Sequence, residues 1–379
     1  MKIKLYSILF LLFFTIIFTS CEKKSSQNSI DNKVKISHQI KYAKGFDIQV
    51  VDENKKIIIK APYPNAKERF EYLISNHTDS TKSITQIKAP VQKIVVTSTT
   101  HIPMLELLGV ENRLIGFQNT QYVSSKKTRQ RIDDGYVKEL GKEFALNTET
   151  LLELQPDLVV GFAMTKTNKA YNLIEQNGIP IILNGDWLEE TPLGRAEWIK
   201  FFGVLFGKEK EADSIFRSLE RDYLDAKEIA EKSIKKPTIL SGAIMSNDVW
   251  NLPAGESFVA QFLKDANVNY LWKDSKGKGS LNLSFESVFD KAQDADFWIA
   301  PGYFSTKEQL ISANKHYTSF KAFKSDQIYA PSTKTGATGG VIYFELAPTR
   351  PDLVLKDIIK ITNPDLLPNY QLTFFEKMK

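Results

Sequence analysis

The chain has 379 residues, of which 50 are Lys or Arg and 45 are Asp or Glu, so its net charge is only +5. With 42% hydrophobic residues, this balance excludes a disordered chain and a polybasic nucleic-acid-binding protein. The length exceeds what one compact core usually occupies, so two lobes are expected.

The N-terminus has the pattern of an export signal. Residues 1–20 place two lysines before an apolar run that ends at Phe18, and small residues then precede Cys21. The run is shorter than the roughly 20 residues that a membrane-spanning helix needs. Cys21 is the only cysteine, and its position predicts a lipidated first residue of an exported lipoprotein; a cleaved signal with an unpaired thiol is the alternative. Residues 21–45 are then the lipidated end and a flexible tether.

The next part of the chain predicts an N-terminal lobe over residues 46–190. Short β-prone runs between Phe46 and Ser75 predict extra antiparallel strands at its edge. Apolar strands and helical patterns then alternate, which is typical of a parallel α/β sheet. The expected strands are 93–96, 113–117, 157–161 and 179–183, and the expected helices are 103–108, 149–154 and 171–176.

The segment 191–233 differs, because its apolar residues recur at helical spacing with no strand pattern between them. Gly203 and Gly207 are expected to bend or split it. The part from Glu209 to Ser233 would span about 37 Å as a helix, long enough to run beside both lobes.

Residues 234–379 return to alternating strands and helices and predict a C-terminal lobe. Strands are expected at 238–242, 296–300 and 327–329, and helices at 258–266, 284–289 and 350–361. The predicted fold class is α/β, with two Rossmann-like lobes of mostly parallel sheets, a long backbone helix that joins them, and a ligand cleft between them.

Polar side chains that follow predicted strand ends are candidates for ligand contact, because loops at the carboxyl ends of parallel strands meet at one edge of the sheet. Ser98 and Thr99 follow the strand 93–96 and suit helix capping and pocket lining. His101 comes next, either as a ligand contact or as a residue that begins a helix. No GxSxG pattern surrounds them, so they are not expected to be nucleophiles.

Aromatic residues at other strand ends suit a large ligand, because rigid rings bury area at low entropic cost. The candidates are Trp187, Trp250 and Tyr303, with burial in a lobe core as the alternative for each. Arg350 stands before the closing helix, where it could pair with an anionic ligand oxygen or with an acid of its own lobe.

Other chemistry has little support in the sequence. The four histidines are scattered without metal-ligand spacing, so no metal site is predicted. The glycine-rich run from Thr335 to Gly340 lacks the GK[ST] pattern of a phosphate-binding loop, and a rim loop is expected there.

Four segments in order carry a family pattern: 95–117, 147–161 ("NTETLLELQPDLVVG"), 250–272 ("WNLPAGESFVAQFLKDANVNYLW") and 348–367 ("PTRPDLVLKDIIKITNPDLL"). Together they resemble the substrate-binding proteins of iron-siderophore and cobalamin ABC importers, the class III type with a helical backbone. The resemblance runs from about Val91 to the C-terminus. The preceding strand-rich segment is similar to the extra N-terminal part of the Bacteroidetes versions.

This resemblance implies a non-enzymatic, monomeric receptor without a cofactor that binds an iron-siderophore complex; cobalamin or heme is the alternative ligand. It also implies a membrane-anchored lipoprotein that faces the periplasm, on the inner membrane, and delivers the ligand to an ABC permease. By position, Glu149 and Glu286 correspond to the family's permease-docking acids, although an acid in a first helical turn also favours the helix dipole. A chelatase-like metal-handling enzyme shares this fold, but the export signal and the lack of paired acid and base motifs argue against it.

Overall fold

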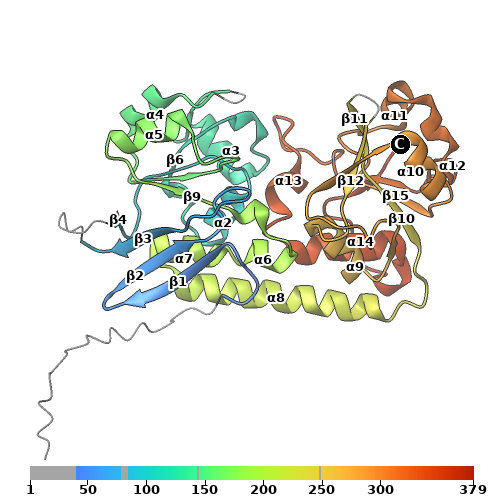
Figure 1. The fold of residues 1–379 in the computed structure, drawn as a ribbon, viewed down its shortest axis with the longest axis horizontal. Coiled ribbons are helices and arrows are strands. Elements are labelled where there is room, and N and C mark those ends of the chain that lie inside the picture. The colour runs from blue at the N-terminus through green and yellow to red at the C-terminus, as the bar shows by residue number, and fades with distance from the viewer. Residues whose placement is uncertain (1–39, 78–83, 143–144, 247–248) are drawn as a thin grey trace, which may run out of the picture. The chain divides into compact units, whose positions relative to one another are not determined.

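The computed structural model describes residues 40–77, 84–142, 145–246 and 249–379 (Figure 1). The predicted signal sequence and the lipidation site Cys21 lie outside these residues. Within the described part of the chain, no helix combines the length and the apolar character needed to cross a membrane.

The first lobe is built on a five-stranded parallel sheet in the order β7-β6-β5-β8-β9. Its central strands are fully buried apolar runs, as strands covered by helices on both faces require. The strands are β5 (Ile94–Val96), β6 (Leu114–Phe117), β7 (Lys138–Glu139), β8 (Leu158–Gly161) and β9 (Ile181–Leu183), and the helices are α2 (His101–Leu107), α3 (Lys126–Asp133), α4 (Thr148–Leu154) and α5 (Lys169–Gln176). We call the part from β1 to β9 the N lobe.

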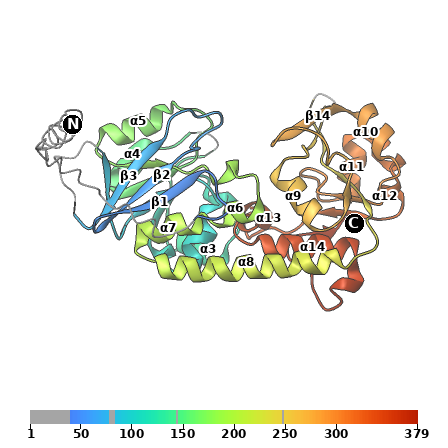
Figure 2. The same cartoon turned by 60° about the horizontal axis from the view of Figure 1, so that its bottom comes forward.

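A separate four-stranded sheet precedes these elements, and it packs on the same core (Figure 2). Its strands are β1 (Phe46–Val51), β2 (Asn54–Ile59), β3 (Phe70–Ser75) and β4 (Thr85–Lys88). The predicted antiparallel pairing is confirmed for β1 with β2 and β2 with β3, whereas β4 pairs parallel to β3. Phe46 and Ile57 belong to the same buried cluster as Ile94, so the extra sheet shares the hydrophobic core of the N lobe.

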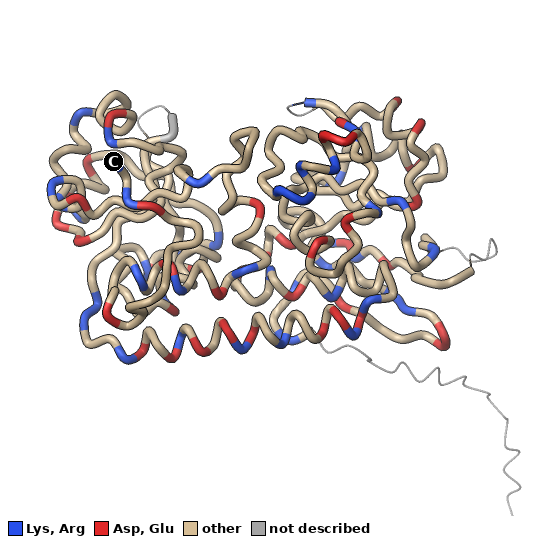
Figure 3. The backbone as a smooth tube through the Cα atoms, turned by 180° about the vertical axis from the view of Figure 1, so that it is seen from behind, with Lys and Arg blue, Asp and Glu red and all other residues tan. Residues whose placement is uncertain are grey.

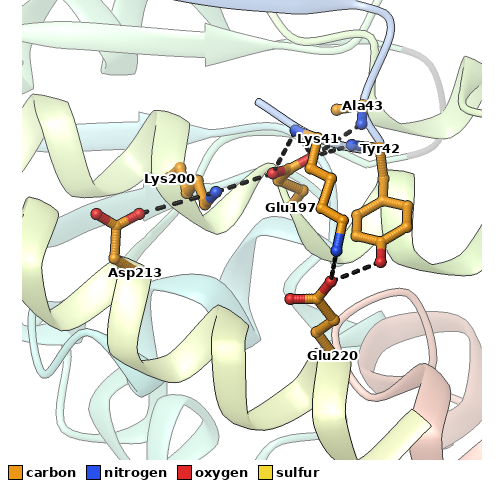
Figure 4. A network of polar contacts seen from close by, with 7 residues as sticks. All are labelled: Lys41, Tyr42, Ala43, Glu197, Lys200, Asp213 and Glu220. Carbon is orange, nitrogen blue, oxygen red and sulfur yellow. Dashed lines mark hydrogen bonds and ion pairs between the residues drawn. The ribbon is translucent and has the colours of Figure 1, made fainter. Parts of the chain in front are cut away.

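Two buried carboxylates hold the backbone that leads into β1. Glu197 accepts hydrogen bonds from the backbone N–H groups of Lys41, Tyr42 and Ala43, and Lys200 pairs with it at 2.9 Å (Figure 4). Glu189 likewise accepts the N–H groups of residues 44 and 45 and the indole N–H of Trp198. Because buried acceptors with several donors fix a backbone firmly, the extra sheet has a defined position on the N lobe. The predicted flexible tether 21–45 is therefore wrong for residues 41–45, whose backbone these two carboxyl groups hold.

Three helices connect the lobes: α6 (Pro192–Ala196), α7 (Ile199–Phe206) and α8 (Glu209–Glu231). Gly207 ends α7 in a left-handed conformation (φ 66°), as predicted for a splitting glycine. Gly203 instead lies inside α7, where a Cβ atom would come within 2.6 Å of Ala212, so its small size lets α8 pack closely. The predicted long helix is thus α8, and Figure 3 shows acidic and basic residues interspersed along it.

The two ends of α8 pack in different cores. Ala212 and Phe216, near its start, belong to the N-lobe cluster. Tyr223, Ala226 and Ala230, near its end, belong to the cluster of the second lobe. This single helix therefore links the two hydrophobic cores.

The second lobe, which we call the C lobe, contains a five-stranded sheet in the order β13-β10-β15-β16-β17 and a three-stranded antiparallel sheet in the order β11-β12-β14. The strands are β10 (Thr238–Ser241), β11 (Ala243–Ser246), β12 (Val249–Pro253), β13 (Asn269–Tyr270), β14 (Ser280–Ser284), β15 (Phe297–Ile299), β16 (Ile328–Ala330) and β17 (Glu376–Lys377). The helices are α9 (Phe258–Asp265), α10 (Phe285–Ala292), α11 (Lys307–Ala313), α12 (Lys321–Lys324), α13 (Ile342–Leu346) and α14 (Pro351–Thr362). The predicted two-lobed α/β fold is confirmed, although the antiparallel sheet was not expected.

Candidate functional site

A cavity of about 430 Å³ has walls from both lobes. The N lobe contributes the chain after β5, the chain after β6, and Phe162 after β8. The C lobe contributes Tyr303 after β15 and residues 339, 341 and 344 around the start of α13. Since parallel strands end at one edge of a sheet, the segments after those ends form these walls.

Two further cavities adjoin this central cavity. One of about 280 Å³ lies on the C lobe and shares Tyr303 and Phe344 with it. The other, of about 410 Å³, lies on the N lobe and shares Thr97, Phe162 and the pair 118–119. The shared residues make the three cavities neighbouring parts of one cleft, whose size is typical of small-molecule sites.

Hydrogen bonds fix the N-lobe wall of the cleft. The Thr97 hydroxyl accepts the backbone N–H of Phe162 at 2.8 Å and lies 3.2 Å from the Tyr171 hydroxyl. The predicted candidates Ser98 and Thr99 come next and line the central cavity. The Ser98 hydroxyl lies 2.9 Å from that of Thr100, and contact of Ser98 and Thr99 with a ligand stays a prediction.

The C-lobe wall follows the ends of β10 and β15. Gly242 (φ 76°) allows the close approach of β12 there, because a Cβ atom would come within 1.9 Å of the Asn251 carbonyl oxygen. Ala300 has a left-handed backbone (φ 55°), which is rare for a residue other than glycine and is often found at functional sites. Tyr303, another predicted candidate, follows it and is 67% exposed in the cleft.

Trp187 lines a different cavity of about 590 Å³, between the extra sheet, the N lobe and the segment before β14. Its ring packs on Phe162 at 5.2 Å, which links this side cavity to the wall of the central one. The side cavity is charged: Glu190 pairs with Lys44 at 3.2 Å and with Lys278, and this second pair lowers the pKa of the Glu190 carboxyl.

His101 does not reach the cleft, contrary to the prediction of ligand contact. It is the first residue of α2 and is fully buried, with its ring 5.4 Å from Phe202. Its Nε2 atom lies 3.9 Å from Asp186, but burial outweighs this acid and lowers the pKa of the imidazole. The alternative weighed from the sequence, a residue at the start of a helix, fits the structure.

Trp250 is also wrongly predicted as a ligand contact, because it lies on strand β12 and not in a loop. Its side chain is fully buried, its ring stacks on Trp298 at 5.4 Å, and its indole N–H donates to the Ser241 carbonyl oxygen at 3.1 Å. The whole Trp250 side chain thus contacts other residues of the C lobe and leaves no surface for a ligand.

Arg350 pairs with an acid of its own lobe. Its guanidinium donates two hydrogen bonds to Asp352, at 2.9 and 2.7 Å, and this partner raises the pKa of Arg350. Arg350 is not among the residues that line the cleft cavities. The predicted contact with an anionic ligand is therefore not supported.

Glu149 and Glu286 are exposed and lie in the first turns of α4 and α10, one in each lobe. The caps of these helices are Asn147 and Ser284, which accept the N–H groups of residues 150 and 287. Both helices lie on the sides of their lobes that face away from α8 (Figure 1). The N-cap residues of both helices are thus other side chains, and the role of the two glutamates in permease docking stays a prediction.

Several aromatic residues of the cleft were missed by the sequence analysis. They are Phe117, Tyr122, Phe162 and Phe344. Phe162 directly follows a predicted strand, so the strand-end rule would have found it. Tyr122 and Phe344 lie within short helices for which no element was predicted, and no sequence signal marked them.

In the part of the chain that the structure describes, no group of three or more His, Cys, Asp or Glu side chains could hold a metal ion.

Comparison with known proteins places this chain in a family. The model of the periplasmic binding protein family matches residues 94–335. An uncharacterized lipoprotein of Methanocaldococcus jannaschii is 25% identical over 93% of this chain and 90% of the relative. An uncharacterized ABC transporter substrate-binding lipoprotein of Bacillus subtilis is 25% identical over 45% of this chain and 52% of the relative.

A solved structure has the same fold. A periplasmic heme-binding protein from Pseudomonas aeruginosa superposes with a TM-score of 0.55 and 16% identity, covering 76% of this chain and 98% of that protein. The chain belongs to the periplasmic binding protein family, whose members are receptors that bind solutes and catalyse no reaction. The predicted relation to substrate-binding proteins of ABC importers is confirmed, whereas the relation to the Bacteroidetes versions stays a prediction.

Proposed function

We propose that this protein is the receptor of an ABC importer that binds a ferric siderophore between its two lobes. The observation that carries this proposal is the lining of the central cavity, where rings from both lobes face hydroxyl and amide groups. Tyr122, Tyr303 and Phe344 are 55%, 67% and 44% exposed there. Exposed rings of this size in a cleft are costly unless a ligand covers them.

The lining favours a chelate with little net charge. All described side chains that line the central cavity are uncharged, and Ser98, Thr99 and Gln118 are among its polar groups. Uncharged donors and ring faces stabilise a neutral surface but do not offset the desolvation of a polyanion. Arg350, the expected partner of catecholate oxygens, is already paired with Asp352. A hydroxamate-type ferric chelate suits this cleft better than a tris-catecholate.

A macrocycle is the second candidate, and the two tyrosines favour it. Tyr122 and Tyr303 line the same cavity from opposite lobes, and a tyrosine phenolate is a known type of heme-iron ligand. The aromatic faces also suit cobalamin, which supplies its own metal ligands. The solved heme-binding structure with this fold is consistent with such a ligand.

The protein is proposed to act outside the cytoplasm as a lipoprotein anchored through Cys21, on the inner membrane, where Glu149 and Glu286 dock onto the permease. Two relatives are named lipoproteins, which supports the anchor. The predicted flexible tether would keep the receptor concentrated beside its permease.

Binding of four probes to the purified full chain tests the ligand. The probes are a ferric trihydroxamate, a ferric tris-catecholate, cyanocobalamin and hemin, measured by titration calorimetry, with native mass spectrometry of protein purified from its own host. We expect the trihydroxamate to bind and the tris-catecholate to bind at least tenfold more weakly. Binding of hemin or cyanocobalamin alone would establish the second candidate. If no probe binds and no chelate or macrocycle co-purifies, the proposed ligand class is wrong.

A further inference from the structure

The segment between β16 and α14 crosses from the C lobe to the N lobe. We call residues 335–346, which include α13, the clasp; Figure 1 shows α13 between the lobes. The Glu345 carboxyl oxygens accept the backbone N–H groups of Ser124, at 2.7 Å, and Ser125, at 2.9 Å. The Thr338 hydroxyl donates to the Gln121 carbonyl oxygen at 2.8 Å. These bonds join chain segments more than 200 residues apart.

The clasp meets the N lobe backbone to backbone. A Cβ atom on Gly336 would come within 2.6 Å of the Ser124 Cα atom, and one on Gly340 within 2.1 Å of the Tyr122 carbonyl oxygen. The Gly336 N–H donates to the Gly340 carbonyl oxygen at 2.8 Å and closes a compact turn. The glycine-rich run expected to be a rim loop is therefore a docked turn whose glycines permit close contact.

Docking brings together two parts of the ligand cavity. Phe344 precedes Glu345 directly and lines the central cavity together with Val341. On the N-lobe side, Tyr122 lines the same cavity two residues before Ser124. The bonds of Glu345 thus join the two segments that carry these rings.

We propose that Glu345 is a positioning residue that holds the clasp on the N lobe, and that release of this contact opens the cleft wall between Tyr122 and Phe344. The proposal rests on the proposed function only in assuming that this cleft receives the ligand. Undocking would move Phe344 and Val341 away from the N lobe and weaken ligand binding, and docking would restore the wall.

The surroundings of Glu345 make this contact sensitive to pH. Its side chain is 2% exposed, and burial raises its pKa to about 7, against the opposing effect of the Ser124 and Ser125 N–H groups. Of the charged groups on the elements packed against it, Glu106 of α2 raises this pKa further. On the same elements, α2 also carries the buried His101, and α3, which begins beside Ser125, carries Lys126, Lys127, Arg129, Arg131 and Asp133.

Docking of the clasp is coupled to protonation of Glu345. A docked Glu345 keeps its proton up to about pH 7, whereas an undocked one would lose it near the ordinary value of 4.5. Docking therefore binds a proton between these limits. The contact is strongest below pH 4.5 and weakens as the pH rises toward 7.

Hydrogen exchange of the Ser124 and Ser125 amides in the ligand-free full chain tests the proposal directly. Protection factors, which correct for intrinsic exchange, are compared for wild type, Glu345→Ala, Glu345→Gln and the exposed control Glu228→Gln between pH 5 and 7.5. We expect Glu345→Ala to lower protection at both amides at least tenfold at pH 5. Glu345→Gln should keep part of the protection but lose its decline with pH, and the control should behave as wild type.

Two results would overturn the proposal. One is protection in Glu345→Ala within twofold of wild type; if that variant does not fold, Glu345→Gln decides alone. The other is an unchanged pH dependence in Glu345→Gln. A folded Glu345→Ala protein should also bind the ferric trihydroxamate about tenfold more weakly than Glu228→Gln. If the trihydroxamate does not bind wild type either, the proposed function is wrong. The hydrogen-exchange data would still show whether Glu345 holds the clasp on the N lobe.

Discussion

Two groups of aromatic residues in this molecule have similar side chains but opposite environments, one buried and one exposed. The first is the buried C-lobe group of Trp250, Trp298, Tyr317 and Phe320, and the second is the cleft group of Tyr122, Phe162, Tyr303 and Phe344. In the first group, rings pack on one another at 5.1 to 5.6 Å and every polar atom has an internal partner. In the second group, three of the four rings are exposed. Residue type therefore does not separate core from binding surface, whereas exposure and internal hydrogen bonding do.

The contacts of Trp250 show why it belongs to the core. Its indole N–H and that of Trp298 donate to the carbonyl oxygens of Ser241 and Gly242, two residues of the C-lobe wall. The buried group thus supports the backbone that forms the C-lobe wall, although it does not touch the ligand space. Its effect on binding would be indirect, through stability.

Replacing Trp250 with alanine should have the largest effect on stability. We expect Trp250→Ala to lower the free energy of unfolding by about 3–5 kcal/mol, because a fully buried ring leaves a cavity and an unpaired carbonyl oxygen. Denaturant unfolding measures this loss, and Trp250→Phe should lose less. The folded fraction should bind its ligand with near-normal affinity. A normal unfolding midpoint together with lost binding would place Trp250 in the ligand site after all.

Replacing Tyr303 should show the opposite pattern. We expect Tyr303→Ala to weaken ligand binding by about 1–3 kcal/mol, since the ring covers the ligand face from the C lobe. The free energy of unfolding should change by no more than about 0.5 kcal/mol, as for other exposed positions. Calorimetric titration beside Tyr136→Ala, an exposed tyrosine outside the cleft cavities, provides the matched control.

The variant Tyr303→Phe separates the two candidate ligands. Stacking on a siderophore needs only the ring, so affinity should stay within about twofold of wild type. Iron ligation in heme needs the phenol oxygen, so hemin binding through Tyr303 would be lost. Normal binding by Tyr303→Ala would contradict the assignment of this ring to the ligand surface.

Much of the fold could be predicted from the sequence because its signals are local. The buried strands β5, β8 and β15 are short apolar runs, and α8 has a long helical period that is bounded by Gly207. The antiparallel sheet of the C lobe was missed because β12 ends in the residues Asn-Leu-Pro, which favour a turn, and pairing with β14 overrides that preference. Strand pairing is nonlocal, and no local pattern announces it.

The site was harder to predict than the fold, for the same reason. The strand-end rule located Ser98, Thr99 and Tyr303 on the cleft wall, and it failed for Trp250 because an unpredicted strand carries that residue into the core. It failed for His101 because α2 begins two residues earlier than the expected helix 103–108 and includes this buried residue. The contact of Glu345 with Ser124 and Ser125 joins distant segments, so it became visible only in three dimensions.

Two exposed acidic residues, Glu149 and Glu286, lie outside both aromatic groups. For Glu286, its own backbone N–H and Ser284 lower the pKa of the carboxyl, so it is ionised at neutral pH. If their role is docking, their replacement should change neither the core nor the cleft.

Reversing both charges should therefore affect the isolated protein only slightly. We expect the double variant Glu149→Lys, Glu286→Lys to keep wild-type affinity for its ligand and to lose about 0.5–1 kcal/mol of stability from the first turns of α4 and α10, because lysine opposes the helix dipole there. Growth of a host that depends on this receptor should nevertheless fail on limiting ligand, since two attractive contacts with a basic permease surface become repulsive. The loss should lie mainly in the association rate and should shrink at high salt, as rim charges require.

The matched control is Glu153→Lys with Glu228→Lys, which reverses two other exposed acids, on α4 and α8, away from the first turns. Normal growth of the double variant at normal expression would show that the two glutamates serve only their own helices, and the permease contact would then have to lie elsewhere on the two lobes.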